Sequence, residues 1–332
     1  MTKKEHFISI VIPNFNGSNI IEKCLDCVFS QNYSNFEIIV VDDFSSDNSL
    51  EKTKKYKTLK VIKNKKNLGF AGSCEIGAKN CSGELILFLN TDAFLIDTKT
   101  FSEINSRFEK NKNLNILGFT QVSTINETNF LGSEIDIFFN INSFDINRVK
   151  KYTMVGGACF ATRNNIYNNL GGIDSTYFLY VEEVDYMFRS LKSGYDTEVS
   201  EIKVVHLGGG STKNDYDSTT NVNKVSNREY NSLVSIFKNF DLLSLSIVTP
   251  LWLFFYLLEI FFLTLTLRFK YLEVYLLIFK KLLLNLRGIL KKRAENFKVF
   301  KITDFQLLKM GYILPTNLKI IYIFFLGIPK FK

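Results

Sequence analysis

The chain has 332 residues, of which 46% are hydrophobic and 22% charged, enough for one large globular domain or two smaller ones. Its formal net charge of +8 is unevenly placed: residues 1–240 hold 27 Lys/Arg and 28 Asp/Glu, whereas residues 241–332 hold 14 and 5. The excess positive charge therefore lies in the most apolar part of the chain, where it favours an anionic membrane surface as a partner. No basic stripe with interleaved aromatic residues occurs in the first 240 residues, so we expect no nucleic-acid partner.

Cysteine use indicates a reducing compartment. The chain has five cysteines, an odd number, and no signal-peptide pattern, so we expect it in the cytosol. Cys24 and Cys27 form a Cys-x-x-Cys pair inside a helix-like stretch. Without a second pair or a histidine cluster, this pair is more typical of a packed helix face than of a zinc or redox site.

The first 120 residues alternate short apolar runs with amphipathic stretches. We expect strands at 7–13, 36–43, 59–64 and 84–92, and helices at 18–31, 45–56 and 67–80. This alternation predicts an α/β fold, with a mostly parallel, Rossmann-like sheet and helices on both faces. From 120 to 215 the pattern is irregular, apart from a helix start near Tyr180 and a short strand at 202–206.

Residues 84–92 read ELILFLNTD, a run of apolar residues that ends in Asn90-Thr91-Asp92. The run is typical of a buried strand in a parallel sheet. A carboxylate at the end of such a strand lies where open α/β sheets bind ligands, and its oxygens suit Mg²⁺ or Mn²⁺. The alternative is that Asp92 only caps the next turn.

Three carboxylates, Glu182, Glu183 and Asp185, fall within one turn of TYFLYVEEVDYMFR (176–189). Their mutual repulsion predicts a raised pKa for at least one of them, as a general base near neutral pH requires. The alternative is an acidic first helical turn that is stabilised by the helix dipole.

His206 ends the strand at 202–206 and precedes a run of glycines and the pair Ser211-Thr212. A neutral imidazole can bind Mn²⁺ beside a carboxylate and phosphate oxygens. The alternative is a core histidine with no ligand.

The order of the motifs resembles a known enzyme family. The motifs are IVIPNFN, VVDDFSSDNS, NLGFAG, LFLNTDA, GGACF, GGIDSTYFLYVEEVDYMFR and VVHLGGGST. Over residues 7–240 the chain resembles a family 2 glycosyltransferase of the GT-A fold, in the rhamnosyltransferase-like branch that builds bacterial surface polysaccharides.

The resemblance implies roles for particular positions. Nucleotide contacts are implied for Pro13, Asn14, Asn16, Asp42, Asp43, Ser45, Asn67, Gly69, Phe70 and Thr91. Metal contacts are implied for Asp92 and His206, and the general base for Glu183. Because the family usually has Asp at this position, Glu182 or Asp185 could share or take the role of the base. Two further departures are Asn90, which begins the metal motif where the family has Asp, and Glu75, which stands where the family often has Asn.

The implied reaction is an inverting, Mg²⁺- or Mn²⁺-dependent transfer of a sugar from a UDP- or dTDP-linked donor to a hydroxyl of a lipid-linked or polysaccharide acceptor. A non-catalytic protein that binds nucleotide-sugars or scaffolds polysaccharide assembly is the alternative. A nucleotidyltransferase or a dehydrogenase on a similar α/β fold has no support, since no G-x-G-x-x-G opens the first helix.

Residues 243–267 contain one charge, Glu259, and are long enough to span a bilayer. We therefore expect a catalytic domain at 1–240 and a helical membrane-association region at 241–332. Because the basic stretch at 268–293 and the catalytic domain both belong on the cytoplasmic face of the membrane, we favour attachment within the interface, which Pro250 could help by bending the helix. A true span and burial within a homo-oligomer are the alternatives.

Overall fold

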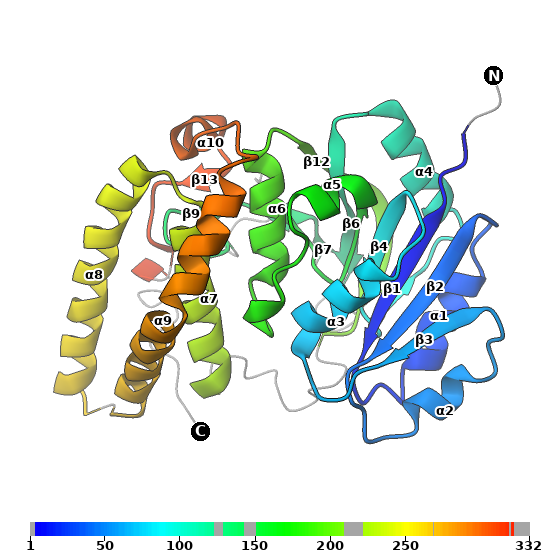
Figure 1. The fold of residues 1–332 in the computed structure, drawn as a ribbon, viewed down its shortest axis with the longest axis horizontal. Helices are drawn as coiled ribbons and strands as arrows, with labels where there is room; N and C mark the ends of the chain where they lie inside the picture. Colours follow the sequence, from blue (N-terminus) through cyan, green and yellow to red (C-terminus); the bar gives the residue numbers. More distant parts are fainter. Residues whose placement is uncertain are drawn as a thin grey trace.

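The computed structural model describes residues 4–122, 129–142, 151–208, 222–267, 269–318 and 320–321. Figure 1 shows a large sheet flanked by helices on one side of the molecule and a group of long helices on the other. The sheet has nine strands, and its main path runs in the order β3-β2-β1-β4-β11-β6-β12-β5, with β7 paired to β6.

The first half of the sheet is parallel, as predicted. Its strands are β1 (Ile8–Asn14), β2 (Phe36–Asp42), β3 (Leu59–Lys63) and β4 (Leu85–Leu89). The helices between them are α1 (Ile21–Phe29), α2 (Ser49–Thr53) and α3 (Gly69–Lys79). The second helix is shorter than the predicted 45–56 because residues 45–48 form the turn after β2, in which Asp47 accepts hydrogen bonds from the backbone of Ser18 and Ser49.

The second half of the sheet is mixed, which the irregular pattern after residue 120 did not reveal. Its strands are β5 (Ala93–Leu95), β6 (Leu114–Val122), β7 (Asn129–Phe130), β11 (Cys159–Arg163) and β12 (Asp196–His206). Strand β11 lies antiparallel between β4 and β6, while β12 is parallel to β6 and antiparallel to β5. The α/β prediction is confirmed, and its mostly parallel sheet becomes a mixed one because β11 enters the centre in the opposite direction.

Helices cover both faces of the sheet. The side chains of Ile8, Ile10 and Ile12 pack in the layer of α1 and α4 (Thr100–Lys110), whereas Val11 packs in the layer of α3, α5 (Asn164–Asn169) and α6 (Glu182–Lys192). This alternation follows from the two-residue period of a strand. Cys24 is buried in the α1 layer.

The C-terminal helices pack onto the sheet unit rather than apart from it. They are α7 (Val222–Asn239), α8 (Leu242–Leu265), α9 (Phe269–Asn296) and α10 (Asp304–Met310). Lys192 at the end of α6 is fully buried and pairs with Asp304 at 2.6 Å and Asp241 at 3.1 Å. A last short strand, β13 (Ile313–Leu314), pairs with β9 (Ile135–Asp136). The helices predicted at 243–267 and 268–293 are both present, and buried charges fasten them to the rest.

Candidate active site

The carboxyl ends of β1 and β2 carry one connected polar network. Asn14 lies opposite Asp42 in the strand register, and its Nδ2 donates to Asp42 Oδ1 at 3.0 Å. The backbone N–H of Ser45 donates to Asp42 Oδ2 at 3.2 Å, and Ser45 Oγ accepts from the backbone of Asn16 at 2.9 Å. Asn14 Oδ1 is buried without a hydrogen-bond partner among the described residues. Pro13, the residue before Asn14, is half-buried.

Asp43 fixes the start of α3. Its carboxylate accepts from the backbone N–H groups of Leu68 and Gly69, both at 2.8 Å, and from Asn64 Nδ2 at 2.8 Å. The Asn67 side chain accepts from the same Gly69 N–H at 3.0 Å. Asp43, which follows β2, and Asn67, which follows β3, are therefore linked through the Gly69 N–H. Phe70 lies next to Gly69 and packs partly buried against the core.

Asp92 and His206 meet at the end of β4. The antiparallel pairing of β12 with β5 sets His206 opposite Ala93, and its Nε2 lies 3.4 Å from Asp92 Oδ2. Thr91 lies half-buried between Asn90 and Asp92, and Asn90 Oδ1 is buried without a hydrogen-bond partner among the described residues. The rest of the motif after Gly208 lies outside the described residues.

This donor set fits a divalent cation in part. The described residues contain no group of three or more His, Cys, Asp or Glu that could hold a metal ion. Mg²⁺ and Mn²⁺ are nevertheless often held by one or two protein ligands together with water and substrate phosphates. Asp92 and His206 therefore suffice only if a diphosphate supplies the remaining oxygens.

Glu182 and Glu183 begin α6, and neither carboxylate forms an ion pair with a described residue. Glu182 is 2% exposed, while Glu183 is half-buried and packs against Gly157 so closely that a Cβ there would lie 2.7 Å from Glu183 Oε1. In both residues Oε2 is buried without a hydrogen-bond partner among the described residues. Burial raises the pKa of both carboxyls, and the neighbouring charge of Glu183 raises that of Glu182 further.

Asp185 has a different environment from the two glutamates. Its carboxylate accepts from Arg189 Nε at 2.9 Å, Lys238 Nζ at 3.2 Å and Asn239 Nδ2 at 2.7 Å. Burial alone would raise the pKa of Asp185, but the charges of Lys238 and Arg189 outweigh it and hold the pKa below its ordinary value. This carboxylate is therefore a permanent ion-pair partner.

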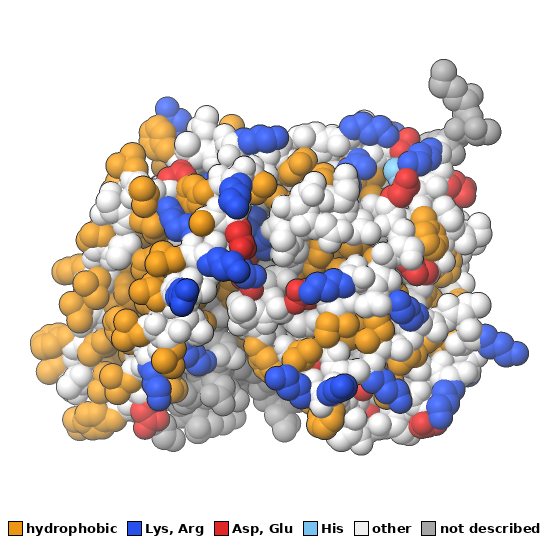
Figure 2. Space-filling model, in the orientation of Figure 1, with side chains coloured by type: hydrophobic (Ala, Val, Ile, Leu, Met, Phe, Trp, Pro, Cys, Tyr) orange, Lys and Arg blue, Asp and Glu red, His pale blue; other side chains and the backbone are white. Residues whose placement is uncertain are grey.

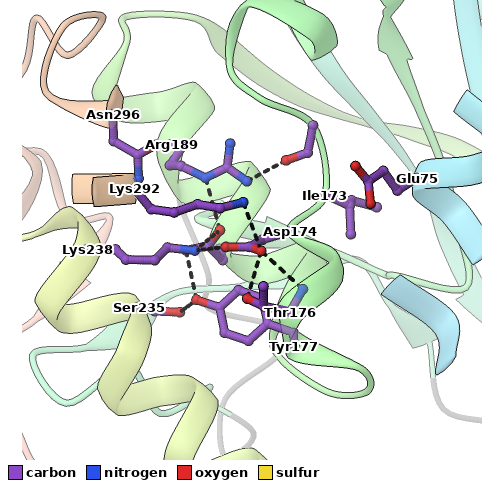
Figure 3. Close-up of polar contacts among 12 residues, drawn as sticks. Glu75, Ile173, Asp174, Thr176, Tyr177, Arg189, Ser235, Lys238, Lys292 and Asn296 are labelled. Atoms are coloured by element: carbon purple, nitrogen blue, oxygen red, sulfur yellow. Dashed lines mark hydrogen bonds and ion pairs between the residues drawn. The ribbon is translucent and has the colours of Figure 1, made fainter. Parts of the chain in front are cut away.

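A second buried carboxylate, Asp174, joins the same network. Figure 3 shows Lys238 and Lys292, which come from α7 and α9, converging on Asp174, with Nζ atoms 2.7 and 3.0 Å from its oxygens. Burial works against the charged form of Asp174, but the two lysines lower its pKa far below the ordinary value. The segment that leads to Glu182 is thus fastened to two C-terminal helices.

The backbone just before Glu182 is strained. Phe178, Tyr180 and Val181 all have positive φ angles, of 60°, 74° and 72°. Such conformations cost about 1–3 kcal/mol each for residues other than glycine, and they concentrate at functional sites. Gly69, itself at φ 74°, allows the close approach of this segment, since a Cβ there would lie 2.2 Å from the carbonyl oxygen of Phe178.

Several of these residues gave no signal as isolated positions in the sequence. Asp174 and Gly157 lie within recognised motifs, but Lys238 and Lys292 come from helices whose sequences read as ordinary amphipathic or basic stretches. Their roles depend on pairing with residues far away in the chain.

Comparison with known proteins gives the family. The family model for glycosyl transferase family 2 matches residues 9–180. An uncharacterized glycosyltransferase of Haemophilus influenzae is 25% identical over 252 residues, which are 71% of this chain and 81% of that protein. The UDP-Glc:alpha-D-GlcNAc-diphosphoundecaprenol beta-1,3-glucosyltransferase WfgD of Escherichia coli is 31% identical over 109 residues, 32% of this chain and 43% of WfgD.

A solved structure agrees in fold. The crystal structure of GalNAc-T7 with UDP, GalNAc and Mn²⁺ has a TM-score of 0.56 at 15% identity, covering 71% of this chain and 48% of that one. This likeness supports the predicted GT-A fold. Because the family match takes in more than half of the chain, the protein belongs to glycosyl transferase family 2 and is a glycosyltransferase.

Proposed function

We propose that this enzyme transfers a sugar, with inversion, from a UDP- or dTDP-linked donor to a hydroxyl of a lipid-linked or polysaccharide acceptor in bacterial surface glycan synthesis. The observation that carries the proposal is the glutamate pair at the start of α6, in which each carboxylate has one buried oxygen without a hydrogen-bond partner among the described residues. The Asn14–Asp42 and Asp92–His206 pairs at the strand ends support it. The motif order supports the rhamnosyltransferase-like branch. The diphosphoundecaprenol acceptor in the name of WfgD supports a lipid-linked substrate.

Glu183 is the general base in this proposal. The acceptor hydroxyl attacks the anomeric carbon, the bond to the nucleotide diphosphate breaks, and the hydroxyl proton passes to the Glu183 carboxylate. Glu183 is the more accessible of the two glutamates, and burial has raised its pKa. Glu182 lies beside Glu183 at the start of α6, and its raised pKa lets it share the proton. Asp185 is already bound to Lys238 and Arg189 and serves as a structural anchor.

The donor lies along the strand ends. Asp42 and Asn14 would bind the base, with Asn16, Ser45 and Asn67 beside the nucleotide. Asp92 and His206 would hold Mg²⁺ or Mn²⁺, which would neutralise charge on the leaving diphosphate. Asn90 positions this turn.

The proposal includes attachment to the cytoplasmic face of a membrane, which the length and apolar surface of α8 support. This helix is the one described helix that is long and apolar enough to cross a bilayer, and 17% of its most apolar stretch is buried. Figure 2 shows hydrophobic side chains gathered over α8 and α9. Exposed apolar side chains on α8 include Leu243, Phe254, Leu257, Phe261, Phe262 and Leu265.

The packing of α8 supports an orientation in the plane of the membrane. Trp252, near the middle of α8, contacts Phe279 of α9 at 6.1 Å between ring centroids. Lys280 and Lys281 follow Phe279 directly, so a spanning α8 would bring both lysines to the centre of the bilayer. That costs about 2.5–3.5 kcal/mol for each charge by insertion measurements. An interfacial position leaves them at the headgroups.

The first prediction concerns the base. Glu183→Gln keeps the size of the side chain but removes its basicity, so we expect transfer to fall by at least about 100-fold while donor affinity changes little. Transfer is measured as acceptor-dependent release of the nucleotide diphosphate, and affinity by calorimetry. Retained transfer would overturn the role of Glu183, and a wild-type protein that binds donor without releasing nucleotide diphosphate would indicate a non-catalytic binding protein.

The second prediction concerns the metal ligand. In Asp92→Ala we expect the increase in donor affinity on adding Mn²⁺ to be lost, because one of two protein ligands is gone. Calorimetric titration of UDP with and without Mn²⁺ measures this directly. Asp97→Ala, at an exposed position in the same stretch, is the matched control. An unchanged response to Mn²⁺ in Asp92→Ala would contradict the assignment.

The third prediction follows from the raised pKa of Glu182. Since its pKa is higher in the folded than in the unfolded protein, the wild type loses stability as pH rises above the unfolded value of about 4.3. Glu182→Gln does not titrate, so it should melt at a higher temperature than wild type at pH 7–8 and at a similar one at pH 4. A tenfold difference in proton affinity between the folded and unfolded proteins corresponds to about 1.4 kcal/mol of stability, or roughly 2–4 °C in melting temperature. The exposed Glu201→Gln variant should follow the wild type, and a lower melting temperature of Glu182→Gln at pH 8 would refute the prediction.

The fourth prediction tests membrane attachment. The full chain should float with vesicles that contain anionic lipid, and less with neutral vesicles, because exposed Lys280, Arg287 and Lys291 add electrostatic attraction. The double variant Leu257→Glu/Phe261→Glu should bind at least about 10-fold more weakly, since it puts charges on the inserted face. A chain that forms soluble oligomers and ignores both vesicle types would support burial of α8 between copies instead.

A further inference from the structure

A single side chain from α7 holds the strained segment that leads into the glutamate pair. Asn231 is 1% exposed. Its Nδ2 donates to the carbonyl oxygens of Tyr177, Leu179 and Tyr180 at 3.1, 3.0 and 2.7 Å. An amide offers two N–H groups, so the three carbonyls share them. Few side chains could satisfy so many backbone acceptors in so little space.

The local backbone explains why a side chain serves as donor here. The positive φ angles at Phe178, Tyr180 and Val181 take residues 178–181 out of any helix or strand, so the carbonyls of Leu179 and Tyr180 join no regular ladder. The carbonyl of Tyr177 also accepts the Leu179 N–H at 2.7 Å. Strain of this kind persists only where the surroundings fix it. On the other side of the segment, the Phe178 carbonyl accepts from Ala71 N–H at 3.3 Å, and Gly69 lies directly against it. Asn231 and the start of α3 thus hold the segment from two sides.

The segment ends where α6 begins. Val181, with its left-handed backbone, is the residue just before Glu182, and its carbonyl accepts the Asp185 N–H at 2.8 Å in the first turn of the helix. The direction in which the two glutamates leave the helix therefore depends on the conformation that Asn231 holds. A residue that touches neither donor nor acceptor can in this way set the position of the base.

We propose that Asn231 is a positioning residue for the Glu182–Glu183 pair, acting through the carbonyls of residues 177–180. The inference rests on the proposed function, in which Glu183 accepts the acceptor proton. It gives a residue of α7 an influence on the rate of sugar transfer, although α7 lies outside the stretch matched by the family model.

The test compares three substitutions at Asn231 in the full-length protein. Asn231→Ala removes both N–H donors, and Asn231→Asp keeps the size but turns a donor into an acceptor that faces three carbonyls. For both we expect kcat to fall about 100-fold, the size of effect that misplacement of a catalytic group by about 1 Å can have. The KM for the donor should stay within about twofold, because the nucleotide groups at the strand ends are untouched. Asn231→Ser keeps one donor and should recover part of kcat.

Asn105→Ala is the matched control for a general loss of stability. Asn105 is also buried, and it hydrogen-bonds the backbone of Lys4 and His6 at the start of β1, away from the strand ends that carry the site. Its kcat should stay near wild type at temperatures where it is folded. Hydrogen exchange of the amides in 178–185 should quicken in Asn231→Ala and not in Asn105→Ala.

The outcomes separate this inference from the proposed function. Should Asn231→Ala and Asn231→Asp keep kcat within about threefold of wild type, or should Asn105→Ala lose as much, the positioning role is overturned. If Asn231→Ala does not fold, Asn231→Asp decides, and wild-type kcat in that variant with unchanged exchange overturns the role. If Glu183→Gln is inactive and Asn231→Ala is fully active, only the positioning role of Asn231 is refuted. If Glu183→Gln is active, both the role of Glu183 as base and the positioning role of Asn231 are refuted.

Discussion

The architecture around the candidate active site depends on one buried cluster of charges. Lys238 bridges Asp174 and Asp185, Arg189 binds Asp185, and Lys292 binds Asp174, all at ion-pair distance. Removing one partner from such a cluster typically costs about 3–5 kcal/mol, because the charge left behind stays buried. That cost is comparable to a large part of the net stability of an ordinary domain. The cluster therefore links α6, α7, α9 and the segment at 174–181 through buried ion pairs.

The cluster gives the C-terminal helices a role at the candidate site besides the membrane attachment proposed for them. Lys238 and Asn231 from α7 and Lys292 from α9 hold the segment before Glu182. The domain boundary predicted at residue 240 rests on a shift in charge and hydropathy along the sequence. Buried contacts such as the ion pair of Lys192 with Asp304 cross this boundary.

The sequence predicted the parts of the site that depend on strand order. Asp42 and Asp43 follow from the rule that loops after parallel strands meet at one edge, and Asn14, which the resemblance implied, bonds to Asp42 there. The resemblance implied that Asp92 and His206 act together, but the antiparallel pairing of β12 with β5 that joins them was not predicted. The place of β11 was equally hidden, since a five-residue buried strand has no alternation to reveal it.

The carboxylates of α6 show where a linear motif stops being informative. Glu182, Glu183 and Asp185 are chemically alike and adjacent, so the sequence could not divide their roles. The division comes from partners distant along the chain: Lys238 and Asn239 lie 53 and 54 residues beyond Asp185 and keep it ionised. The glutamates receive no such cation from the described residues and are left with unpaired oxygens and raised pKa values. Ion pairs keep Asp185 ionised, whereas burial raises the pKa of Glu182 and Glu183, and a raised pKa suits these two carboxyls to accept a proton.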